Sequence, residues 1–301
     1  MRVIALLATY NEARFIGAQL EHLAAHGIEA YLIDNESTDD TVAIAERHLG
    51  RGLASIETLP RDGVSRLRVR LARKEELAAS LDADWFIHLD ADEFRLAPRS
   101  GQRLADALAE VDALGYNAVT FQEFTFLPTR ESPDHDHPAF QRTMRWYFPF
   151  TPFFPHRLSA WKRQPRPVDL TWLAGHIVRF PGLRMYPRAF PMRHYLSLSV
   201  EHAMRKYACM RYDEEEIRQG VHARWRGRMY GTPAATDPGL LRLPSARELR
   251  VYTGDDALDA RWPRRRARWL EEWAARATGE EYRRAQGPLQ LSGERRVASG
   301  E

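Results

Sequence analysis

Residues 85–94 read WFIHLDADEF, an apolar run that ends in three acidic residues. The first five residues predict a buried strand, because a short apolar run of this length fits a strand packed on both faces. Successive strand residues point to opposite faces, so Asp90 and Asp92 are expected to share one face and Glu93 the other. Two close carboxylates repel each other unless a cation compensates them. The stretch therefore predicts either a cation site at a strand end or a solvated acidic turn.

The chain before this stretch alternates between strand and helix patterns. Apolar runs predict strands over residues 3–8, 30–33 and 54–59, and helical spacing predicts helices over 12–25, 38–48 and 66–81. Ser37 and Asp40 have the spacing of a capping box at the start of the second helix. Strand–helix–strand order with short loops predicts an α/β fold, with a mostly parallel sheet flanked by helices.

The pattern changes in the second half of the chain. A helix is predicted over 102–114 and a strand from residue 118, after which a segment rich in proline and aromatic residues predicts β-rich or irregular structure to residue 191. Helices are expected again over 200–217 and 264–277. We therefore predict a catalytic domain over 1–200 and a C-terminal helical extension over 201–301. The helically spaced Met204, Tyr207, Met210 and Ile217 are expected to be core residues.

Composition limits the class of protein. The 301 residues carry a net charge of +3, which is far from the concentrated charge of a nucleic-acid-binding protein. The single cysteine, Cys209, cannot form an internal disulfide, which is typical of a reducing compartment. No run approaches the roughly 20 apolar residues of a membrane helix. We expect a soluble, cytoplasmic protein.

Polar side chains follow each of the first two predicted strands. Thr9, Asn11 and Glu12 follow the first strand, and Asp34 and Ser37 follow the second. Ligands of open parallel sheets bind outside the carboxyl ends of the strands, where these side chains and the acids of 90–93 would meet. The hydrogen-bonding groups suit a base and a ribose, and the carboxylates suit Mg²⁺ or Mn²⁺.

Three motifs now resemble a known family. ATYNE at 8–12, DNESTDDT at 34–41 and the 85–94 stretch resemble the family-2 glycosyltransferases, in the same order and at similar spacing. HYLSLSVEH at 194–202 looks like a feature of one bacterial branch. The resemblance covers about residues 1–95. It implies a Rossmann-like GT-A fold, a nucleotide-diphosphate sugar donor such as a UDP-sugar, Mn²⁺ or Mg²⁺, and transfer to an acceptor hydroxyl with inversion.

The resemblance also implies roles for individual residues. The nucleotide pocket would take Thr9, Asn11, Glu12, Asp34, Ser37, Lys74 and Asp90, with Asp34 accepting from the base. Asp90 would face the ribose or the metal, and Asp92 and His194 would bind the metal. Arg73 and His176 are second candidates for the nucleotide and the metal site. The turn reads DNES where the family usually has DDGS, so Asn35 and Glu36 replace Asp and Gly.

The resemblance also requires a catalytic base. Inversion needs one base that removes the proton of the acceptor hydroxyl. The candidates are Glu123, Glu131, Asp134, Asp136 and Asp169. We favour Asp169, because it lies among apolar residues in PVDL and shortly precedes His176.

Two other classes of protein remain as alternatives. A nucleotidyltransferase also needs a metal and a nucleotide, but it usually has a glycine-rich basic loop after the first strand, which ATYNEARF lacks. A non-catalytic membrane- or nucleic-acid-binding protein could use the arginine-rich stretch 261–269, which suits anionic lipid or is an exposed helix end. Under the favoured reading the acceptor is a glycan, a lipid-linked precursor or a small metabolite. Nucleic acid is not expected as a partner. Peripheral contact with the inner face of a membrane is an alternative to a purely cytoplasmic location.

Overall fold

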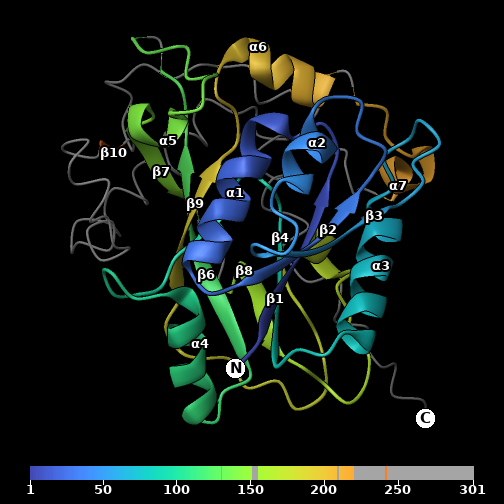
Figure 1. Ribbon diagram of the computed structural model, residues 1–301, viewed down its shortest axis with the longest axis vertical. Coiled ribbons are helices and arrows are strands. Elements are labelled where there is room, and N and C mark those ends of the chain that lie inside the picture. Colours follow the sequence, from blue (N-terminus) through green and yellow to red (C-terminus); the bar gives the residue numbers. More distant parts are fainter. Residues whose placement is uncertain (130, 151–154, 209, 220–240, 243–301) are drawn as a thin grey trace, which may run out of the picture.

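The computed structural model describes residues 1–219 and 241–242, apart from residues 130, 151–154 and 209 (Figure 1). The helix expected over 264–277 and the arginine-rich stretch 261–269 lie outside the described residues, so the division at residue 200 stays a prediction. None of the helices within the described ranges has both the length and the apolar character needed to cross a membrane.

A twisted sheet forms the centre of the molecule (Figure 1). Its first half is parallel, in the order β3-β2-β1-β4, and consists of β1 (Val3–Thr9), β2 (Glu29–Asp34), β3 (Leu53–Thr58) and β4 (Trp85–Leu89). Its second half is largely antiparallel and continues from β4 through β8 (Arg157–Lys162), β6 (Ala118–Phe126), β7 (Trp146–Phe150) and β10 (Leu241–Arg242). The short β5 (Glu93–Arg95) pairs with β9 (Phe190–Tyr195), which lies parallel to β6.

Helices cover both faces of this sheet. One face carries α1 (Ala13–Ala25), α2 (Thr41–Glu46) and α4 (Leu104–Ala113), and the other carries α3 (Leu67–Ser80). Shorter turns of helix are α5 (Phe140–Thr143), the 3₁₀ turn η1 (Trp172–Gly175), α6 (Val200–Ala203), the π-helix η2 (Met204–Ala208) and α7 (Glu214–Arg218). The predicted α/β fold is confirmed, and the sequence pattern places most of its first strands and helices within a few residues.

The continuous apolar runs are explained by burial on both faces. In β1, Val3, Ala5 and Leu7 belong to the core under α1 and α4, whereas Ile4 and Leu6 pack in the core under α3. A strand between two helical layers has no polar face, so it reads as an unbroken apolar segment.

The helix predicted over 200–217 is wrong, because the chain divides there into α6, η2 and α7. The backbone before α7 pairs with the loop before α3: Ser65 N–H donates to the Arg211 carbonyl, and Asp213 N–H donates to the Ser65 carbonyl. Asp213 then starts a new helix, since its carboxylate accepts from the backbone N–H of Glu216. A tertiary strand-like contact therefore interrupts a segment whose local pattern is helical.

The capping box predicted at Ser37 is also wrong. Asp40 is the N-cap of α2, and its side chain makes no capping hydrogen bond. Ser37 Oγ instead accepts a hydrogen bond from the backbone N–H of Asn11, 2.9 Å away. Ser37 therefore connects the loops after β1 and β2.

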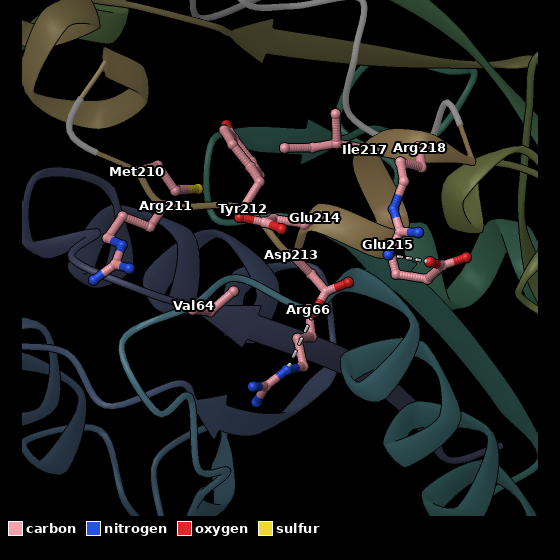
Figure 2. Close-up of a pocket in the computed structure, with 10 residues that line it drawn as sticks. All are labelled: Val64, Arg66, Met210, Arg211, Tyr212, Asp213, Glu214, Glu215, Ile217 and Arg218. Atoms are coloured by element: carbon pink, nitrogen blue, oxygen red, sulfur yellow. Dashed lines mark ion pairs between the residues drawn. The ribbon is translucent and has the colours of Figure 1, made fainter.

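Two residues predicted for the core, Met210 and Ile217, line a surface cavity (Figure 2). The cavity has a volume of about 640 Å³ and lies between α7 and the loop that precedes α3, from which Val64 and Arg66 contribute. Both Met210 and Ile217 are half-buried. The broken helix explains this, since α7 no longer continues the face of α6.

Candidate functional site

The carboxyl ends of three strands meet at one edge of the sheet. Thr9 of β1 pairs with Asp34 of β2, and Leu7 of β1 pairs with Leu89 of β4. The polar residues that follow these strands are therefore neighbours, as the sequence pattern predicts. This edge is the candidate functional site.

Asn11 and Ser37 hold the first two loops of the site together. Asn11 has a φ of 56°, and its side-chain oxygen accepts from the backbone N–H of Thr38 at 2.7 Å. Ser37 N–H donates to Asp34 Oδ2 at 3.0 Å. These contacts fix the path of both loops beside Asp34.

Glu36 stabilises the turn over residues 34–37, in which the sequence departs from the family pattern. Glu36 has a φ of 60°, a left-handed conformation that glycine adopts without strain, which explains the glycine of the usual DDGS pattern. Here Glu36 Oε2 accepts from the backbone N–H groups of Arg61 and Asp62. The glutamate therefore adopts the conformation and also anchors the loop before α3.

Several buried polar atoms at this edge have no hydrogen-bond partner among the described residues. They are Thr9 Oγ1, Asp34 Oδ1, Asn35 Oδ1 and one guanidinium nitrogen of Arg61. The Arg61 guanidinium lies over the ring of Tyr10, 3.5 Å from its centre. Buried polar atoms usually have partners, so a group of unpaired ones indicates that a polar ligand binds here.

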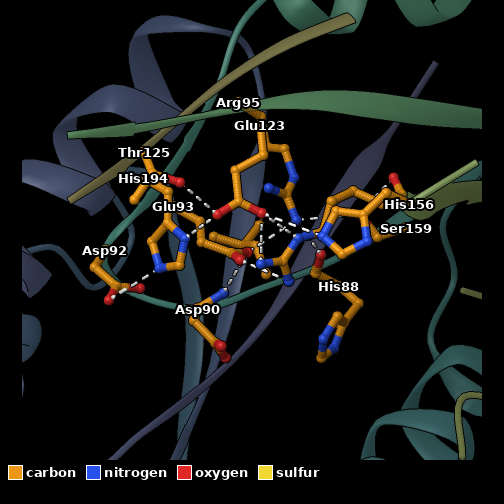
Figure 3. A network of polar contacts seen from close by, with 12 residues as sticks. His88, Asp90, Asp92, Glu93, Arg95, Glu123, Thr125, His156, Ser159 and His194 are labelled. Atoms are coloured by element: carbon orange, nitrogen blue, oxygen red, sulfur yellow. Dashed lines mark hydrogen bonds and ion pairs between the residues drawn. The ribbon is translucent and has the colours of Figure 1, made fainter. Parts of the chain in front are cut away.

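Asp90 and Asp92 do not share a face, because β4 already ends at Leu89. A turn follows, in which Glu93 N–H donates to the Asp90 carbonyl. Asp90 is exposed, whereas Asp92 is only 3% exposed, and the two carboxylates point in different directions (Figure 3). The alternation rule fails here because it applies only within an extended strand.

Two cationic side chains approach Asp92. Its Oδ2 lies 2.8 Å from Lys206 Nζ and 3.5 Å from His194 Nε2. Burial works against ionisation of Asp92, but the charges of Lys206 and His194 outweigh it and hold the pKa of this carboxyl below its ordinary value. Asp92 is therefore an ionised carboxylate in a buried position.

His194 is oriented by Glu123 on its far side. Its Nδ1 donates to Glu123 Oε1 at 2.6 Å, while Nε2 faces Asp92 (Figure 3). Burial opposes a charge on the ring, but the Glu123 and Asp92 carboxylates outweigh this effect and raise the pKa of His194 to about 10. The sequence predicted Glu123 only as a candidate base. It did not predict the pairing with His194, which lies 71 residues away in the chain.

A buried charge network supports this histidine (Figure 3). Arg157 donates to Glu123 Oε2 and also pairs with Glu93 at 3.2 Å. Glu93 in turn pairs with Arg95 at 2.9 Å. All four side chains are buried, and each charge has an opposite partner, as buried charges require.

Lys206 of η2 is a further member of the site. Its Nζ lies 2.9 Å from Glu12 Oε1 as well as 2.8 Å from Asp92. Burial raises the pKa of Glu12 to about 7, and Lys206 acts against that rise. Lys206 was missed by sequence reasoning, which had no signal for it beyond its place shortly after the HY motif.

Three basic residues of α3 have different surroundings. Lys74 is buried under the site, where its Nζ contacts His88 Nδ1 and the Leu89 carbonyl, and burial lowers its pKa to about 8. Arg73 points to β3 and pairs with Glu57. Arg70, one turn before Lys74, is within the electrostatic influence of Asp90 and Glu12.

Asp169 and His176 make their contacts with residues other than Asp92, and His176 lies next to His156, whose Nε2 is 3.5 Å from Glu123 Oε2. The Asp169 carboxylate accepts from the backbone N–H and the hydroxyl of Thr171, at the start of η1. The His176 ring contacts that of His156, 5.5 Å away. Within the described residues, the hydrogen bonds and ring contacts of these two side chains do not include Asp92.

Asp92 and His194 fit one part of a divalent-metal site. A metal-binding imidazole usually donates its other N–H to a carboxylate, as His194 does to Glu123. Mn²⁺ and Mg²⁺ accept carboxylate oxygens and keep other positions for water or phosphate oxygens. In the described part of the chain no three His, Cys, Asp or Glu side chains gather around one such position. The two residues fit a metal that also binds a phosphate, and His194 Nε2 would give up its proton to solvent when the metal binds.

Comparison with known proteins identifies the family. The model of glycosyl transferase family 2 matches residues 5–165, more than half of the chain. Uncharacterized proteins of Mycobacterium tuberculosis and Mycobacterium bovis are each 29% identical over 103 residues, covering 31% of this chain and 25% of theirs. The aligned stretch thus spans about a quarter of the length of these curated relatives.

Solved structures with partial similarity to this chain include those of two proteins. The mannosyltransferase PcManGT from Pyrobaculum calidifontis, solved with GDP-Man and Mn²⁺, is 19% identical, with 95% of this chain and 83% of that chain covered and a TM-score of 0.41. TarS of S. aureus is 14% identical, with 65% and 37% covered and a TM-score of 0.40. The family match includes β1 to β8 and most of the candidate site, and this chain belongs to glycosyl transferase family 2.

Proposed function

We propose that this protein transfers a sugar from a nucleotide-diphosphate donor to an acceptor hydroxyl, with inversion at the sugar carbon and with help from a divalent metal. The observation that carries the proposal is the set of unpaired buried polar atoms at the ends of β1 and β2, at the edge where Asp92 also lies. A nucleoside would supply the missing partners of Thr9 and Asp34. Asp90, exposed beside them, is available to the ribose.

The diphosphate would lie near Asp92. In the reaction the bond between the sugar carbon and the diphosphate oxygen breaks, and negative charge grows on the leaving phosphate. Asp92 and His194 would hold Mn²⁺ or Mg²⁺, whose charge stabilises the leaving group without a proton. Glu123 keeps Nε2 of His194 directed at this position.

The acceptor hydroxyl loses its proton as the new bond forms, and this step needs a base. Asp169 stays our prediction for that base. Replacing Asp169 with Asn would then lower kcat at least a hundredfold with little change in donor binding. A kcat within threefold of the wild type would move the search to Glu131, Asp134 and Asp136.

The first experiment is calorimetric titration with UDP, and separately with GDP, in the presence and absence of Mn²⁺. We expect binding that Mn²⁺ strengthens, and we expect Asp92→Ala to remove that dependence together with metal-dependent donor hydrolysis. Asp106→Ala is the matched control, because Asp106 is an exposed acid on α4 that pairs with Arg103. Full metal-dependent activity in Asp92→Ala would refute the metal assignment.

Failure to bind any nucleotide at millimolar concentration would favour the non-catalytic membrane- or nucleic-acid-binding alternative. If a nucleotide does bind, a panel of nucleotide sugars screened by thermal stabilisation identifies the donor, because a ligand that binds the native state raises Tm. Acceptors to test are glycans, lipid-linked precursors and small metabolites.

A further inference from the structure

Lys206 occupies a cation position between two carboxylates of the candidate site. Its Nζ contacts Glu12 and Asp92, and it also lies 4.8 Å from the centre of the Phe15 ring. The side chain is only 11% exposed. The chain therefore supplies its own buried cation at the place where the donor diphosphate and its metal are proposed to bind.

Lys206 and a divalent metal would use the same oxygen. Lys206 Nζ bonds to Oδ2 of Asp92, and His194 Nε2 faces that same Oδ2. A metal held by Asp92 and His194 would therefore displace the ammonium group from this oxygen, and the proton of His194 Nε2 would leave to solvent. Without any cation, Glu12 and Asp92 would be two carboxylates left together in a poorly hydrated position, which is costly.

The segment that carries Lys206 can stay in place while the lysine side chain moves. Lys206 lies in the π-helix η2, a rare conformation that is frequent at functional sites. A short α6 precedes it, and the Tyr207 hydroxyl donates to the Leu196 carbonyl. The long lysine side chain can leave Asp92 while this contact keeps η2 over the site.

We propose that Lys206 fills the cation position beside Asp92 until the donor arrives, and that it then pairs with the donor diphosphate while the metal takes Asp92. This inference rests on the proposed function. It makes Lys206 a catalytic residue that neutralises the leaving phosphate. It also predicts that the metal and the nucleoside diphosphate bind cooperatively, because each makes the displacement of Lys206 more favourable for the other.

The test replaces Lys206 with Met, which keeps most of the length of the side chain and removes its charge. Mn²⁺ binding is measured alone, by electron paramagnetic resonance, and UDP binding is measured at saturating Mn²⁺ by calorimetry. We expect Lys206→Met to bind Mn²⁺ about tenfold more tightly than the wild type, because the competitor is gone, and to bind UDP about tenfold more weakly. GDP replaces UDP if the wild type prefers it.

Two further variants make the result decisive. Arg205→Met removes the neighbouring positive charge, which pairs with Glu201 and Asp136 instead of Asp92, and should leave both affinities near those of the wild type. Lys206→Arg keeps the charge, so its Mn²⁺ affinity should stay within threefold of the wild type. If Lys206→Met does not fold, Lys206→Gln, which removes the charge and keeps a polar side chain, replaces it with the same expected changes in Mn²⁺ and UDP affinity.

Unchanged Mn²⁺ affinity in a folded Lys206→Met would overturn the competition, and unchanged UDP affinity would overturn the pairing with the diphosphate. If the wild type binds no nucleoside diphosphate, the proposed function is wrong, and the diphosphate half of this inference is wrong with it. The Mn²⁺ measurement still decides the competition in that case.

Discussion

Glu123 connects the candidate site to the interior of the protein. One carboxylate oxygen accepts from His194 and from the hydroxyl of Thr125, and the other accepts from Arg157. The side chain is buried on β6. Its negative charge lies between those of His194 and Arg157. Glu123 therefore both orients the His194 ring and neutralises the buried Arg157 guanidinium.

We expect Glu123→Gln to lower the free energy of unfolding by about 3–5 kcal/mol, because breaking a buried ion pair leaves an uncompensated charge. Glu110→Gln is the control. Glu110 pairs with Arg99 at the surface, where an ion pair contributes about 0–1 kcal/mol. Urea unfolding of both variants measures the difference. Equal losses in the two would contradict the assigned role of Glu123.

At the scale of single elements, η1 shows how a loop can be fixed by one glycine. Gly175 has a φ of 86°, and a Cβ there would lie 2.7 Å from Leu71 Cδ2 of α3 and 2.9 Å from His88 Nε2 of β4. The chain passes this close to α3 and β4 only because residue 175 has no side chain. The contact holds η1 against the buried His88–Lys74 pair under the site.

We predict that Gly175→Ala destabilises the protein more than Gly182→Ala, by about 1–3 kcal/mol, the usual cost of overpacking. Gly182 is the matched control, since its φ is 77° and a Cβ there would meet nothing within 4 Å. The Gly182→Ala variant therefore has the backbone strain of a positive φ without the steric overlap. Chemical unfolding of the two variants measures the difference, and a larger loss in Gly182→Ala would show that strain and not packing dominates.

At the scale of the whole molecule, several histidines are folded in their neutral form. Burial lowers the pKa of His202 to about 4 and that of His22 to about 3, and it holds the pKa of His88 well below its ordinary value. The unfolded chain takes up protons at these residues near pH 6.5. Their contribution to stability is therefore complete above about pH 6.5 and is lost as the pH falls toward 4.

The substitution His202→Asn tests this effect at one residue. The asparagine side chain retains an acceptor for the Leu198 N–H that His202 Nδ1 binds. Between pH 8 and pH 5 the wild type should lose about 2 kcal/mol of unfolding free energy that the His202→Asn variant does not lose, given a folded pKa of about 4. Urea unfolding at both pH values gives the difference. A pH-independent gap between the two proteins would show that His202 does not titrate on unfolding in this range.

The sequence determined the framework of the fold and the edge that carries the site. Apolar runs buried on both faces predicted β1, β2 and β4, and the polar residues after them predicted where these strands end together. This worked because strand burial and helical periodicity are local properties, and parallel strands bring their carboxyl ends to one edge.

The tertiary structure alone decided which side chains meet at that edge. Lys206 lies 194 residues from Glu12 and 114 from Asp92, and His194 lies 71 residues from Glu123. The tertiary structure also ends β4 at Leu89, which separates Asp90 from Asp92. Backbone pairing with Ser65 divides the helix that was predicted over 200–217. Charges and backbone groups far apart in the chain find partners only after burial makes an unpaired one costly, and no local pattern records that choice.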